Sequence, residues 1–63
     1  MKFLFGDFVL VRRGFYTGIK GHLTDYNGPE NKYYFEGVYP IGTLRMRAVN
    51  AWINEAELDK VEE

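Results

Sequence analysis

The sequence predicts a single all-β domain. Short stretches in which apolar and polar residues alternate recur along the chain, and clusters of turn-forming residues separate them. The chain has 63 residues, which suffices for one small core that buries roughly 60% of the unfolded surface. No linker, internal repeat or low-complexity segment divides the chain. We therefore expect one domain over residues 1–63, built as a small sheet or barrel of short strands.

The first strand is expected over residues 7–13. Val9 and Val11 alternate with their neighbours and share one face of the strand, and we expect that face to be the more buried one. Gly14 follows a pair of arginines and is expected to end the strand. The chain then turns through residues 14–18, which are bounded by glycines.

The second strand is expected over residues 19–26, with Leu23 facing inward. Gly21 lies inside this strand, where a glycine weakens the pairing unless a bend or a close backbone approach requires the missing side chain. The sequence NGPEN at residues 27–31 is a strong turn signal, because Asn-Gly favours a positive φ and proline fixes the next φ angle.

The third strand is expected over residues 32–39, and the sequence PIGT at residues 40–43 turns the chain again. The fourth strand begins near Leu44, and its period slips. Apolar residues occupy even-numbered positions in its first half and odd-numbered positions in its second half. Strict alternation cannot place both sets on one face. An extra residue near Ala48 and Val49 would do so, and we predict a β-bulge there.

The sequence NEAEL at residues 54–58 predicts a single 3₁₀ turn followed by a short last strand. Asn54 can cap this turn, and Glu57 stands where the second member of a capping-box pair is required. Only one turn fits before Leu58, which favours a 3₁₀ turn.

Composition excludes several classes of site. The chain has no cysteine and one histidine, so the common zinc-binding ligand sets are absent, and we expect neither a metal nor a cofactor. Covalent catalysis needs a nucleophile with an adjacent base, and the chain has neither cysteine nor serine to act as the nucleophile. Its carboxylates form no recognisable catalytic pair. We therefore expect a protein that is not an enzyme.

Charge and hydropathy limit the classes of partner that we expect for this protein. The net charge is −1, from eight Lys and Arg against nine Asp and Glu, which differs from the strongly basic balance of dedicated nucleic-acid binders. Basic residues gather in the first third of the chain and acidic residues at its end. No stretch approaches the roughly 20 apolar residues of a membrane span. We expect a soluble, cytoplasmic protein that does not associate with membranes.

The stretch GDFVLVRRGFYTGIKGHLTDY at residues 6–26 resembles the KOW motif, a strand–loop–strand unit of ribosomal proteins and transcription-elongation factors. The family pattern begins with Gly-Asp, alternates apolar residues, and places glycines on either side of a loop before a second strand. The matching positions are Gly6, Asp7, Val9, Val11, Gly14, Gly18, Gly21 and Leu23. The stretch AWINEAELDKV at residues 51–61 resembles the closing half of Tudor-type barrels. Together these resemblances imply a small five-stranded SH3-like barrel with a single 3₁₀ turn before the last strand.

Small SH3-like barrels mostly act as adaptors, so the resemblance implies a binding module that docks on a protein partner, in a transcription, ribosomal or phage-host complex. The chain has five Phe, five Tyr and one Trp, and we expect most of these rings to lie in the core. The Tyr and Trp side chains that cannot be buried with satisfied polar groups are expected at the surface as binding anchors. The candidate binding residues are Arg12, Arg13, Phe15, Tyr16 and Lys20 in the first hairpin, with Tyr39 and Trp52 as a secondary patch.

The alternative is a KOW-type domain that binds RNA or DNA through the same hairpin. Arg12, Arg13 and Lys20 would then contact phosphates, while Phe15 and Tyr16 would stack on bases. A homodimer is a further alternative, because a chain this short with exposed aromatic side chains gains stability by association. The glycine spacing itself fits a small barrel whether or not a ligand binds.

Overall fold

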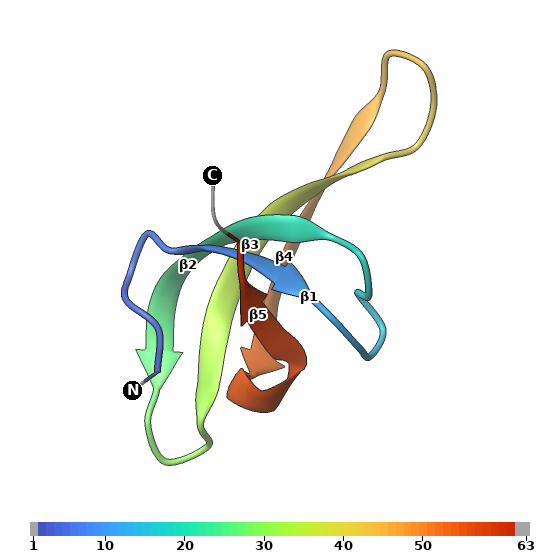
Figure 1. Ribbon diagram of the computed structural model, residues 1–63. Coiled ribbons are helices and arrows are strands. Elements are labelled where there is room, and N and C mark those ends of the chain that lie inside the picture. The colour runs from blue at the N-terminus through green and yellow to red at the C-terminus, as the bar shows by residue number, and fades with distance from the viewer. Residues whose placement is uncertain (1, 62–63) are drawn as a thin grey trace.

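A computed structural model describes residues 2–61 as five antiparallel strands and one 3₁₀ turn (Figure 1). In chain order these are β1 (Phe8–Val11), β2 (Lys20–Asn27), β3 (Lys32–Pro40), β4 (Met46–Asn54), η1 (Glu55–Glu57) and β5 (Leu58–Lys60). The strands form one sheet in the order β4-β3-β2-β1-β5. The predictions of an all-β chain and of one 3₁₀ turn before the last strand are therefore confirmed. Within residues 2–61, β4 and β5 are the edges of the sheet and do not pair with each other.

The core lies on one face of the sheet. In each strand, the alternation of apolar and polar residues places the apolar side chains on that face. Val9 and Val11 are buried, as predicted, and Leu23 is buried opposite Phe35. The buried side chains are Phe3, Val9, Val11, Ile19, Leu23, Tyr33, Phe35, Val49, Ile53 and Leu58. They come from the N-terminal segment, the loop between β1 and β2, and all five strands. A single cluster therefore joins the whole length of the described chain.

The expectation that most aromatic rings lie in the core is wrong. Only Phe3, Tyr33 and Phe35 are buried, and the other rings are half-buried or exposed. The cause is the period of a strand, because successive side chains point to opposite faces. Tyr33 points into the core, for example, while Tyr34 lies on the outer face of the sheet and packs against Trp52.

The β-bulge predicted near Ala48 and Val49 is also wrong. The pairing of β3 with β4 runs without a shift from Lys32 opposite Asn54 to Pro40 opposite Met46. The apolar period does slip in β4, but the first part of the strand extends beyond the core and is exposed on both faces. Nothing there requires both apolar sets to share a face. The irregularity of the sheet lies in β2 instead, between Leu23 and Asp25.

The turn between β2 and β3 and the start of η1 differ from expectation in detail. The residue with positive φ in this turn is Asn31, at 56°, and not the glycine of the Asn-Gly pair. The predicted capping box is absent, since the Asn54 side chain makes no capping hydrogen bond. The N–H of Glu55 donates to the carbonyl oxygen of Asn31 at 3.0 Å, so the turn itself satisfies the first backbone donor of η1.

Gly21 is required because the backbones of β2 and β3 lie very close together at this position. A Cβ atom at this position would fall on the carbonyl oxygen of Glu36, and only 2.7 Å from the Cα atom of Gly37, its partner across the ladder. The close approach of the two backbones explains a glycine inside a strand. Of the two reasons that the sequence left open, a bend or a close backbone approach, the structure shows the close approach.

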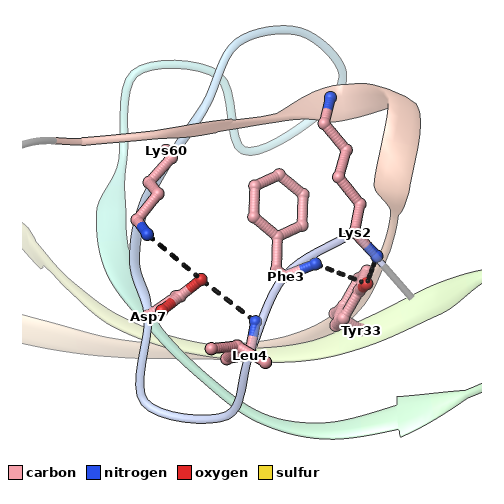
Figure 2. Close-up of polar contacts among 6 residues, drawn as sticks. All are labelled: Lys2, Phe3, Leu4, Asp7, Tyr33 and Lys60. Carbon is pink, nitrogen blue, oxygen red and sulfur yellow. Dashed lines mark hydrogen bonds and ion pairs between the residues drawn. The ribbon is translucent and has the colours of Figure 1, made fainter.

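Hydrogen bonds to the Tyr33 hydroxyl hold the N-terminal segment against the sheet (Figure 2). The backbone N–H groups of Lys2 and Phe3 donate to the Tyr33 hydroxyl oxygen at 2.8 and 3.0 Å. The same hydroxyl donates to the Glu55 carboxylate at 2.8 Å. The Phe3 ring packs edge-on against the Tyr33 ring at 5.4 Å. We call these four residues the N-terminal clasp.

Strands β3 and β4 continue past the core as a two-stranded arm, which we define as residues 38–48. Figure 1 shows this hairpin projecting from the rest of the molecule, and the Cα extents of 39 × 23 × 18 Å reflect it. The arm exposes a set of apolar side chains: Val38, Tyr39, Ile41, Leu44 and Met46. It lies outside the core, because no side chain of residues 38–48 is buried.

Candidate binding groove

A groove of about 520 Å³ lies between the β1–β2 loop and the base of the arm. Phe15, Tyr16, Thr17 and Ile19 line it from the loop side, and the other wall comes from residues 39 and 47–50. Its lining therefore combines aromatic rings with one cationic side chain, that of Arg47. Among residues 2–61, no carboxylate lines the groove.

Glycines shape the loop that presents the aromatic side chains. Gly14 and Gly18 have φ angles of 99° and 90°, which L side chains rarely adopt. The Thr17 hydroxyl donates to the carbonyl oxygen of Gly14 at 2.6 Å, and the Gly18 N–H donates to the carbonyl oxygen of Val11 at 2.8 Å. These bonds close the loop tightly on the end of β1. The glycine spacing noted in the sequence thus has a backbone role.

Phe15 and Tyr16 occupy the tip of this loop and have different surroundings. Phe15 is 94% exposed, whereas Tyr16 is half-buried and packs against the core cluster. Their rings meet edge to face, with centroids 5.0 Å apart. Tyr16 therefore anchors the loop, and Phe15 stands out into solvent at the mouth of the groove.

The opposite wall comes from the base of the arm. Tyr39 and Arg47 are direct partners across the β3–β4 ladder. They lie on the same face as the buried Val49, so they continue the core face of the sheet beyond the core. Tyr39 is 48% exposed. Its ring and the Arg47 side chain thus give the groove a mixed apolar and cationic wall.

The structure brings together three of the seven residues that the sequence singled out. Phe15, Tyr16 and Tyr39 line the groove. Arg13 is exposed in the same loop. Arg12 is engaged elsewhere, because its guanidinium lies 3.6 Å from the Asp59 carboxylate and its Nε donates to a backbone carbonyl in η1 at 3.1 Å.

Lys20 and Trp52 lie outside the groove. Lys20 borders a second hollow of about 440 Å³, which also includes Phe8 and His22. His22 is exposed and packs against the Phe8 ring. Trp52 is on the outer face of β4, 46% exposed, with its ring 5.2 Å from that of Tyr34. The secondary patch of Tyr39 and Trp52 is thus divided between the two faces of the sheet.

Several arginines near the groove form no ion pair within the described part of the chain. The ion pairs of residues 2–61 engage Arg12, Lys32 and Lys60. Arg13, Arg45 and Arg47 form no ion pair with another described residue. The sequence has no Asp or Glu between Glu36 and Glu55, so the arm carries positive charge alone.

Sequence reasoning missed Arg47 and Val49 as parts of the site. Neither residue was singled out in the sequence, yet Arg47 shares its face with Val49 and both line the groove. The signal that could have found the site is the absence of acidic residues from 37–54. Residues 8–24, which include the β1–β2 loop, also contain no acidic residue, so both walls of the groove come from stretches without Asp or Glu.

Among the described residues, the two groups with shifted pKa values belong to the N-terminal clasp and not to the groove. Burial raises the pKa of the Tyr33 hydroxyl. The hydrogen bond from Tyr33 lowers the pKa of the Glu55 carboxyl. Within residues 2–61, no group of three or more His, Cys, Asp or Glu side chains is placed to hold a metal ion. No helix in that range is long and apolar enough to cross a membrane.

Comparisons with family models, with curated proteins and with solved structures find no match to this chain.

Proposed function

We propose that the protein is a binding module of the SH3-like type that holds an extended segment of a protein partner in the groove and performs no catalysis. The observation that carries this proposal is the groove itself. Phe15 and Tyr39 offer apolar rings on its two walls, and Arg47 adds a directional cation. Tyr, Trp and Arg are the side chains that most often anchor protein interfaces, because they combine a large contact area with a polar group.

We further propose that this sheet is a KOW-like and Tudor-like barrel. The features that support this proposal are the five antiparallel strands and the 3₁₀ turn before β5. The KOW-like stretch corresponds to the β1–β2 hairpin, and its loop forms one wall of the groove. Under this proposal the protein acts as an adaptor in a transcription, ribosomal or phage-host complex.

The charge of the groove defines the class of partner. Within the described part of the chain, the groove has one arginine and no carboxylate, and Arg13 and Arg45 in its loop and arm form no ion pair. This arrangement favours a segment that carries acidic residues. Its aromatic walls favour an apolar or aromatic side chain between those acidic residues. We therefore propose that the partner segment is extended, acidic and interrupted by aromatic or aliphatic anchors.

A selection from a displayed library of random peptides, with the immobilised protein as target, tests this proposal. We expect the enriched peptides to combine Asp or Glu with an aromatic or aliphatic anchor. Tyr39→Ala and Phe15→Ala should each weaken the binding of a selected peptide about tenfold or more, the range of an interface anchor. Trp52→Ala is the matched control. Trp52 is 46% exposed and Tyr39 is 48% exposed, but Trp52 lies on the opposite face of the sheet, away from the groove. A peptide that binds all of these variants equally would overturn the proposal.

Nucleic-acid binding is the second candidate, and one observation favours it. Phe15, at 94% exposure, stands in a loop with Arg13, which forms no ion pair within residues 2–61, and across the groove from Arg47. An exposed ring beside cations is the arrangement that stacks on the bases of a single strand. If this candidate is correct, mixed-sequence RNA or DNA will bind at low salt, the affinity will fall steeply with salt, and Phe15→Ala will weaken it.

A further inference from the structure

We propose that two copies of the chain pair through the outer edge of β4, which joins their sheets across a two-fold axis. The two edges of the sheet are built differently. β5 has three residues, two of which are the charged Asp59 and Lys60. β4 has nine residues, contains no proline and pairs with β3 without a bulge. No described residue pairs with its outer edge.

Long, regular edge strands are exceptional in proteins that stay monomeric. An unpaired row of backbone N–H and C=O groups is a template for another strand, and natural sheets protect such edges with charges, prolines, bulges or very short strands. β5 has two of these protections, since it is short and charged. Arg47 is the one charged residue of β4. The edge of β4 is therefore the edge that is built to accept a strand.

A second copy fits this edge because the strand is complementary to itself. In the antiparallel register that pairs all nine residues, Asn50 lies on the two-fold axis and faces the partner's Asn50. Arg47, the one charged residue of β4, then faces the partner's Ile53. No arginine faces an arginine in this register. Like charges directly across a strand pair destabilise it, and this register avoids that cost.

The same register covers the exposed apolar residues near β4. Ala48 faces the partner's Trp52, and Met46, which is 61% exposed, faces the partner's Asn54. Residues 46–48 at the base of each arm then pair with residues 52–54 of the partner's β4. An isolated two-stranded hairpin is marginally stable at best, so this pairing accounts for an arm that packs on no core of its own.

This inference is independent of the proposed function. The edge pairing uses backbone groups of β4, whereas the proposed peptide binding depends on the side chains of Phe15, Tyr39 and Arg47. Ala48 and Asn50 border both surfaces. The groove can fail to bind peptides while the dimer forms, and the dimer can fail while peptides bind. The oligomeric state and the peptide selection therefore test separate statements.

Cysteine cross-linking tests the register, because the chain has no cysteine of its own. Directly opposite residues of antiparallel strands have Cα atoms about 4.5–5.5 Å apart, within the range that a disulfide spans. Asn50→Cys should therefore form a covalent dimer under mild oxidation. Ala48→Cys is the matched control on the same exposed face, since two such cysteines would be roughly 13 Å apart. The Ala48→Cys variant should cross-link only when mixed with Trp52→Cys, because Ala48 faces the partner's Trp52 in this register.

Sedimentation equilibrium tests the association itself. Wild-type protein should show a reversible monomer–dimer equilibrium over a concentration series. Asn50→Lys, which sets two ammonium groups opposite each other on the axis, should weaken the dimer about fivefold. Thr24→Lys adds the same charge to the interior strand β2 and should leave the equilibrium unchanged. A wild-type protein that stays monomeric throughout, or an Asn50→Cys variant that cross-links no better than Ala48→Cys, would overturn the inference.

Discussion

Tyr33 is the residue on which the N-terminal segment depends. Its hydroxyl accepts hydrogen bonds from the backbone N–H groups of Lys2 and Phe3 and donates one to Glu55. The bond with Phe3 is buried. The sequence places Tyr33 in a strand but gives no sign of this role, because all of its partners are distant in sequence. Phe3 is 30 residues away, Lys2 is 31 and Glu55 is 22.

We expect Tyr33→Phe to lower the free energy of unfolding by about 1–3 kcal/mol, because the buried N–H of Phe3 loses its acceptor. Urea denaturation followed by fluorescence measures the change. Tyr34→Phe is the matched control, since Tyr34 is the next residue and its hydroxyl bonds to no described residue. Equal effects of the two substitutions would show that the clasp contributes nothing measurable.

The clasp also predicts how stability depends on acid. The hydrogen bond from Tyr33 holds the pKa of Glu55 below its ordinary value of 4.5, so the folded state binds this proton less readily than the unfolded state. The contribution of Glu55 is therefore present above pH 4.5 and is lost as pH falls through the lowered pKa. A series of urea midpoints should fall on acidification, and Glu55→Gln should make that fall shallower. An unchanged slope in Glu55→Gln would contradict the assignment.

At the level of the elements, alternation in the sequence was enough to locate the strands. The expected strand over residues 32–39 agrees with β3 to within one residue, and the 3₁₀ turn lies where NEAEL predicted it. The bulge was misplaced, because the pattern of β4 was interpreted as if all of the strand faced a core. A sequence does not state where a core ends, and the arm extends beyond it.

The arm is separable from the fold. No buried side chain belongs to residues 38–48, so we expect the core to form without the arm. Replacing residues 39–47 with Asn-Gly joins two direct partners of the ladder, Val38 and Ala48, by a two-residue hairpin turn. We expect the shortened protein to keep its free energy of unfolding to within about 1 kcal/mol and to lose peptide binding in the groove. A shortened protein that binds selected peptides as tightly as wild type would show that the arm forms no part of the site.

The whole molecule combines one small core, one long unprotected edge and one groove with aromatic and cationic walls. The sequence singled out Phe15, Tyr16 and Tyr39, because aromatic residues in loops and at strand ends are candidate anchors, and the fold brings these residues into one groove. It could not predict that Arg12 binds Asp59 or that Trp52 faces away. Those outcomes depend on which strands pair and in which register, and pairing over such separations leaves no local signal.

The central claim is that the groove holds an acidic segment of a protein partner. Its most direct test is a ¹⁵N–¹H NMR titration with a pool of synthetic peptides in which Asp and Glu alternate with Phe, Tyr and Leu. At low salt we expect shifts confined to the groove, at the amides of Phe15, Ile19, Tyr39, Arg47 and Val49. Mixed-sequence RNA and DNA, titrated in parallel, should leave these amides unmoved. If the peptides produce no shifts at low salt, where electrostatic attraction is strongest, or if only the nucleic acids move the groove, the claim is contradicted.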